Sequence, residues 1–117
     1  MEHASDQAGA LAALNAAQFA GRVDEVPFEL VNGDIRLTVT LAQCRENPQA
    51  AGPDSTRVPF SLLFRADDLP EHPFQQVQSL LVTLNDASDT LADGIMLTRV
   101  LRPVGMGPGV YFQAVFN

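Results

Sequence analysis

Length, composition and charge exclude several classes of protein. The chain has 117 residues, enough for one domain, and 46% of them are hydrophobic, an ordinary content for a globular protein. Fourteen acidic residues against seven arginines and no lysine give a net charge of −7. This charge repels phosphate backbones, so we expect no nucleic-acid binding. No apolar run approaches the roughly 20 residues that span a bilayer, so we expect no membrane insertion.

The N-terminal segment indicates where the protein is made. No lysine or arginine precedes Arg22, so the chain lacks the charged start of a secretory signal. We therefore expect synthesis in the cytoplasm without a signal peptide. Later incorporation into an extracellular or particle assembly is left open.

Residues 5–20 are predicted to form an N-terminal α-helix. A serine or aspartate at its start can cap it, alanine dominates its interior, and Gly21 is a natural end. Leu11, Leu14 and Phe19 form a narrow apolar stripe along one side. This stripe either packs on its own domain or docks on a neighbouring subunit, and the sequence leaves both alternatives open.

The pair Asn32-Gly33 predicts a β-hairpin directly after the helix. Asn-Gly tolerates the two positive φ values of a type I′ turn, and hydrophobic residues alternate with polar ones on both sides of it. One face of the hairpin should therefore be buried, and the other should carry a charge pair. The register that follows pairs Leu30 with Ile35, Phe28 with Leu37, and Glu29 with Arg36.

The rest of the chain repeats the strand pattern with turns between the strands. We predict a mainly all-β domain over residues 26–116, either a six-stranded antiparallel barrel or a small sandwich, preceded by the one helix. We expect the fifth strand to be central or covered on both sides, because both its faces are partly apolar. The predicted strands are 26–31, 34–43, 58–65, 76–85, 95–103 and 110–116, with exposed loops at 45–56, 66–73 and 85–94. The predicted core is Phe28, Leu30, Ile35, Leu37, Phe60, Leu62, Phe64, Leu80, Val82, Leu84, Leu97 and Phe112.

Residues able to perform chemistry are few and scattered. The two histidines, His3 and His72, lie near the N-terminus and between two prolines, with no nucleophile at a suggestive spacing. Cys44 is the single cysteine, which rules out an internal disulfide and a cysteine-based metal site. We therefore predict no catalysis and no cofactor.

Three aspartates, Asp86, Asp89 and Asp93, lie close together in the sequence before Gly94. Carboxylate oxygens suit calcium, but the spacing lacks the alternating acidic pattern and the closing glutamate of a calcium loop. Aspartate is also common in turns, where it bonds to its own backbone. The pattern favours a turn, and no metal site is predicted.

Several short motifs resemble a family of small bacterial all-β domains without assigned function. The final strand closes on a pattern similar to that family's Tyr-Glu-Ala-Val-Phe-Asn, with Gln113 in place of the usual acid. The longer acidic loop within residues 78–94 replaces the family's His-Pro-x-Leu-Gly turn. The motifs that carry the resemblance are Gln18-Phe19, Pro27–Leu30, Val58–Phe64, Gln76, Arg102–Gly105 and Tyr111–Asn117.

This resemblance implies a role but no chemistry. Members occur beside phage tail-collar-like proteins, which implies a structural or accessory part in a tail-like or fibre assembly, with no enzymatic activity. We therefore predict a protein-interaction module that binds either itself or tail-collar-like proteins. A small-ligand-binding β-barrel is the alternative. The predicted contact residues come from the helix stripe and from the aromatic last strand, whose open edge could pair with another chain; they are Leu11, Leu14, Phe19, Tyr111, Phe112 and Phe116.

Overall fold

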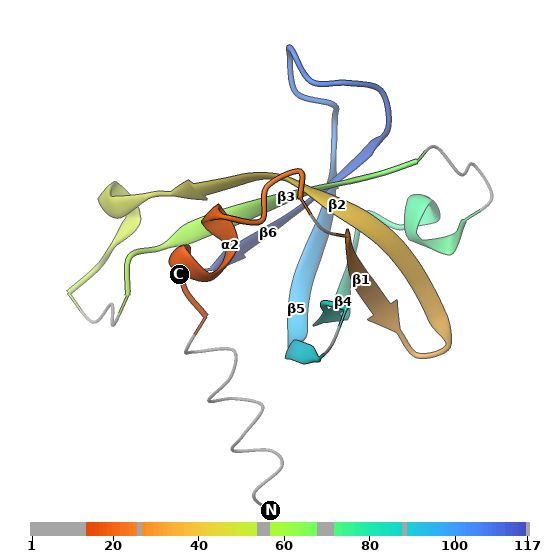
Figure 1. The fold of residues 1–117 in the computed structure, drawn as a ribbon, viewed down its shortest axis with the longest axis horizontal. Coiled ribbons are helices and arrows are strands. Elements are labelled where there is room, and N and C mark those ends of the chain that lie inside the picture. Colours follow the sequence, from red (N-terminus) through yellow and green to blue (C-terminus); the bar gives the residue numbers. More distant parts are fainter. Residues whose placement is uncertain (1–13, 26, 54–56, 68–71, 88, 117) are drawn as a thin grey trace, which may run out of the picture.

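The structure, a computed structural model, describes residues 14–25, 27–53, 57–67, 72–87 and 89–116. It contains a closed antiparallel barrel with the strand order β1-β2-β3-β6-β5-β4, and β4 pairs back with β1. Closure decides between the two predicted architectures in favour of the barrel (Figure 1). The strands are β1 (Pro27–Asn32), β2 (Ile35–Glu46), β3 (Phe60–Ala66), β4 (Ser79–Asn85), β5 (Thr90–Val100) and β6 (Val110–Phe116), and the short helices are α2 (Ala17–Ala20), η1 (Pro48–Ala50) and η2 (Pro73–Gln76).

The opening hairpin forms, but its predicted register is wrong by two residues. The turn is made by Gly33 and Asp34, with a positive φ at Gly33 only, the pattern of a type II′ turn. Leu30 therefore pairs with Leu37, not with Ile35. A shift of two leaves every side chain on its predicted face. The predicted charge pair survives as a diagonal contact, in which Arg36 NH1 donates to Glu29 Oε1 over 2.8 Å.

The predicted loop at 85–94 is largely strand. β4 continues to Asn85 and β5 begins at Thr90. Asp93 and Gly94 together lie opposite Thr83, because the register shifts between Val82 and Leu84. Gly94 has a φ of 70°, so this is a bulge of the kind that needs glycine. The aspartate and glycine that suggested a turn in the sequence serve instead to bend a strand.

The barrel interior is filled by aliphatic and aromatic side chains. All the predicted core residues are buried except Ile35, at the end of the hairpin, and Leu80, which is half-buried. Of the two alternatives for β5, it is central, because it pairs with β4 and with β6; it is not covered on both faces, since Met96 on its outer face is 54% exposed. The buried set also includes residues outside the predicted core list: Val39, Leu41, Phe74, Ala92, Ile95 and Ala114.

The N-terminal helix is shorter than predicted within the described residues. It spans Ala17–Ala20 and ends at Gly21 as expected, whereas Leu14 and Asn15 are not helical. The Leu14 carbonyl is bonded by Arg57 NH1 at 2.7 Å, so a distant side chain takes an acceptor that a helix would use. Residues 5–13 of the prediction lie outside the described residues.

Two aromatic side chains from outside the sheet pack into the barrel. Phe19 of α2 lies 6.1 Å from the Phe28 ring and 6.2 Å from the Phe60 ring. Phe74 of η2 contacts Phe112 edge to face at 6.4 Å. The two helices lie on opposite sides of the barrel in Figure 1. Both side chains are 1% exposed, so short segments of the chain complete the core from two directions.

Candidate interaction surface

The residues predicted to bind a partner lie in the interior. Leu14, Phe19, Tyr111, Phe112 and Phe116 are all at most 4% exposed. The last strand is also no edge, because β6 pairs with β3 on one side and with β5 on the other. A partner could not reach these side chains without displacing the segments that cover them. Leu11, the sixth predicted contact residue, lies outside the described residues.

The contacts of the N-terminal segment favour packing on its own domain. The rings of Phe60 and Phe116 stack at 4.6 Å, and Phe19 lies against Phe60. The Arg57 guanidinium lies 5.6–5.7 Å from the Phe60 and Phe116 ring centres and also donates to Leu14 O. Such cation–π contacts are stabilising. The apolar stripe was predicted either to pack on its own domain or to dock on a neighbouring subunit, and its residues Leu14 and Phe19 pack on their own domain.

His72 and Cys44, which could in principle perform chemistry, have structural partners, whereas His3 lies outside the described residues. His72 Nδ1 accepts from the Phe74 amide, so Nε2 carries the proton and donates to Arg36 O at 3.1 Å. Cys44 Sγ donates to Ala16 O at 3.6 Å. Burial, with a smaller effect of Glu46, raises the pKa of the Cys44 thiol, which disfavours the reactive thiolate.

The aspartates near Gly94 stabilise the local backbone. Asp86 Oδ1 accepts from the Asp89 amide, and Asp86 Oδ2 pairs with Arg22 at 3.2 Å. Asp93 Oδ1 accepts from Thr83 Oγ1 and from the Gly94 amide. Among the described residues no cluster of three histidine, cysteine or acidic side chains could hold a metal ion.

The most exposed apolar side chains lie on the loop between β5 and β6. Leu101 is 93% exposed and Val104 is fully exposed. Figure 1 shows this loop projecting from the body of the barrel. The sequence predicted a strand over residues 95–103, which would include Leu101, but β5 ends at Val100. We call residues 101–107 the apolar loop.

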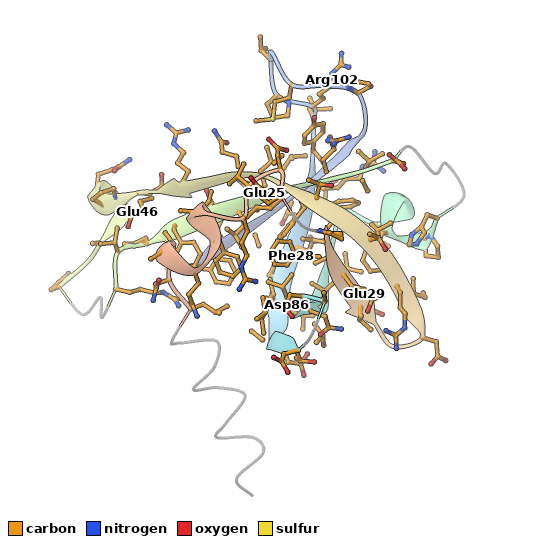
Figure 2. The ribbon with its side chains drawn as sticks, viewed as in Figure 1. Glu25, Phe28, Glu29, Glu46, Asp86 and Arg102 are labelled. Atoms are coloured by element: carbon orange, nitrogen blue, oxygen red, sulfur yellow. The ribbon has the colours of Figure 1, made fainter. Side chains whose placement is uncertain are left out.

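The apolar loop is internally bonded and carries a positive charge. The Met106 amide donates to Pro103 O at 3.2 Å, and Tyr111 Oη donates to Gly107 O at 2.7 Å. These bonds hold the loop on the buried Tyr111. Arg102 makes no ion pair with a described residue (Figure 2), and no acidic residue follows Asp93 in the sequence. The loop is thus an apolar, cationic projection on an acidic protein.

An open pocket of about 260 Å³ lies elsewhere on the barrel, between β1, β2 and the β4–β5 turn. Arg22 lies over the Phe28 ring at 5.9 Å while pairing with Asp86. Because Arg22 covers the buried Phe28 ring, the exposed apolar residues of the pocket are Pro27 and Ala87, which lie beside the carboxylates of Glu29 and Asp86. Its lining residues are Pro27, Phe28, Glu29, Thr38, Asp86 and Ala87, and we call it the acidic pocket.

Sequence reasoning missed both surfaces. The only signal for the apolar loop was the pair Arg102-Pro103, which ends a strand before a glycine-rich turn. The sequence carried no signal for the acidic pocket, because the walls of the pocket come from segments that are distant in the sequence.

Among the helices of the described residues, none has the length and apolar character needed to span a membrane. Comparison of the chain with family models, with curated proteins and with solved structures found no match in any of the three.

Proposed function

We propose that this protein is a non-enzymatic interaction module that binds protein through the apolar loop. The observation that carries the proposal is the nearly complete exposure of Leu101 and Val104 on a projecting loop. Burying one such side chain contributes about 1.5–3 kcal/mol. A loop that is already ordered loses less conformational entropy on binding, and the bonds to Pro103 O and Gly107 O supply that order.

The packing of the interior favours this function over a ligand-binding barrel. The rings of Phe28, Phe64 and Phe112 occupy the inside of the barrel, and Phe19 and Phe74 pack against them. An interior filled in this way resembles the small barrels whose side chains occupy the lumen. The two larger of the pockets found among the described residues involve loops and the outer wall.

We further propose that the module is an accessory or self-assembling component of a tail-like or fibre assembly. The support is the family resemblance of the motifs in the sequence, together with a small domain that presents one projecting contact loop. Its partners would be further copies of the chain or tail-collar-like proteins. No catalytic step and no cofactor form part of this proposal.

Affinity capture with a loop variant tests the interaction. The wild type, the double variant Leu101→Ser/Val104→Ser and the control Leu81→Ser would each be incubated with the purified products of the neighbouring genes and with untagged wild type. Leu81 is 55% exposed on β4 and lies outside the apolar loop, so the control removes a similar amount of exposed apolar surface.

The expected result is capture by the wild type and by Leu81→Ser, with strongly reduced capture by the double variant. Equal capture by all three proteins would overturn the role of the loop. Native mass spectrometry of the wild type addresses the alternative directly, because a stoichiometric small ligand would favour the ligand-binding barrel.

A further inference from the structure

We propose that the apolar loop of one copy of this chain inserts into the acidic pocket of a second copy, in a head-to-tail contact. This inference rests on the proposed function and names its partner. The occupant of the pocket is then residues 101–104 of another molecule. The loop and the pocket are chemically complementary. They lie apart on the same chain, and Figure 2 shows Arg102 well away from Glu29 and Asp86.

The loop supplies two apolar side chains and one cation between them. Leu101 and Val104 are exposed to solvent almost completely, and Arg102 makes no ion pair among the described residues. Two hydrogen bonds between Gln78 and Arg99 fix the base of the loop: the Arg99 amide donates to Gln78 O, and the Gln78 side-chain Nε2 donates to Arg99 O. The projecting tip is therefore held in one orientation relative to the barrel.

The acidic pocket supplies the matching groups. Pro27 and Ala87 give it exposed apolar groups, and Glu29 and Asp86, which also pair with Arg36 and Arg22, line it with carboxylates. Glu29 Oε1 accepts from Arg36 and, at 3.4 Å, from Asn85. No hydrogen bond of Glu29 Oε2 is found among the described residues, so that oxygen can receive the guanidinium of an incoming Arg102.

Charge favours a second copy as the partner. The chain carries fourteen acidic residues, none of them after Asp93, so Arg99 and Arg102 form a cationic end on an otherwise acidic molecule. Complementary charges steer such surfaces together and oppose other orientations. Asp89, exposed on the turn next to the pocket, adds a further negative charge there.

The geometry determines the kind of assembly. A contact between two different surfaces of identical chains is heterologous, and it builds rings if the rotation closes or open filaments if it does not. A contact between identical surfaces would stop at a dimer. The inference therefore predicts growth beyond the dimer as the protein concentration rises.

Two half-defective variants test this contact. The loop variant carries Leu101→Ser, Arg102→Glu and Val104→Ser. The pocket variant carries Thr38→Arg; Thr38 is exposed on β2 directly opposite Glu29, so the new cation fills the pocket and neutralises Glu29. The control Leu81→Ser/Arg45→Glu makes an equivalent apolar and charge change at exposed residues outside both surfaces. Circular dichroism verifies the fold of each variant.

Sedimentation velocity should show wild type and control growing in mass with concentration, whereas each half-defective variant stays monomeric. A mixture of the two variants should form a 1:1 complex that grows no further, because one intact loop meets one intact pocket. Each variant should weaken self-association tenfold or more.

A wild type that stays monomeric at its highest concentration would overturn this inference, as would variants that fail to combine when mixed. Loop-dependent capture of a different protein, with a monomeric wild type, would retain the proposed function and reject the head-to-tail contact. A wild type that neither self-associates nor captures another protein through the loop would reject both the head-to-tail contact and the proposed function.

Discussion

The last strand and the loop that precedes it are adjacent in sequence and opposite in physical character. β6 carries Tyr111, Phe112 and Phe116, which are buried between β3 and β5 or in the ring stack. The apolar loop carries Leu101 and Val104, which contact little of their own chain. The aromatic strand stabilises the barrel, and the aliphatic loop is available to a partner. Hydrophobic content alone does not distinguish a buried segment from an exposed one.

The largest effect should come from the aromatic core. Phe60→Ala removes a fully buried ring that stacks on Phe116 at 4.6 Å and contacts Phe19, and it should lower the free energy of unfolding by about 3–5 kcal/mol. Leu101→Ser should change it by no more than about 0.5 kcal/mol, as surface substitutions usually do. Urea unfolding of both variants measures this difference. Similar losses for the two would contradict the contrast between core and loop.

A smaller loss is expected where the loop re-enters the barrel. Gly109 has a φ of 143°, and a Cβ there would lie 2.7 Å from Ala66 O, so Gly109→Ala should cost about 1–3 kcal/mol. Gly107→Ala is the matched control, since a Cβ at that position meets nothing within 4 Å. Thermal unfolding should give Gly109→Ala the lower melting temperature of the two variants. Equal melting temperatures would show that the backbone before β6 can adopt another conformation without loss of stability.

The attachment of the N-terminal segment depends on Arg57. Arg57→Ala removes the bond to Leu14 O and the contacts with the Phe60 and Phe116 rings, and we expect a loss of about 1–2 kcal/mol. Limited proteolysis should also cut the segment before α2 faster than in the wild type. The exposed Arg45 provides the control. An unchanged cleavage rate in Arg57→Ala would mean that Phe19 alone holds the segment.

The smallest predicted effect concerns the thiol. Burial and Glu46 raise the pKa of Cys44, so less thiolate is present in the folded protein than in the unfolded chain at any pH near the ordinary cysteine value. Reaction with an aromatic disulfide reagent should be slower for the native than for the unfolded protein, and it should accelerate as the pH rises. Glu46→Gln should speed the native reaction slightly. Equal native and unfolded rates at neutral pH would contradict this.

Local patterns predicted the faces of the strands well because those faces depend on alternation alone. The hairpin register was wrong because Asn32-Gly33 and Gly33-Asp34 both suit a two-residue turn, and a shift of two keeps the same residues inside. The bulge at Asp93 and Gly94 was read as a loop because the same residue types serve both structures. The burial of Phe74 was not predicted, since no alternation of apolar and polar residues includes this position.

The candidate site was less predictable than the fold. Whether Leu101 lies in a strand depends on where its neighbour β4 begins, and that is a long-range property of the barrel. The acidic pocket exists only because the β4–β5 turn lies beside β1 and β2. The aromatic last strand attracted the prediction because an open sheet would have left it at an edge, and closure of the barrel removed that edge.

Hydrogen exchange at two protein concentrations tests the contrast between loop and strand most directly. In dilute protein the amides of the apolar loop, apart from the bonded Met106 amide, should exchange quickly and those of β6 slowly. At high concentration, where copies associate, protection should rise in the apolar loop and around residues 86 and 87, with β6 unchanged. Exchange in the loop that stays equally fast at both concentrations, and in the presence of the neighbouring gene products, would contradict its role as the binding surface.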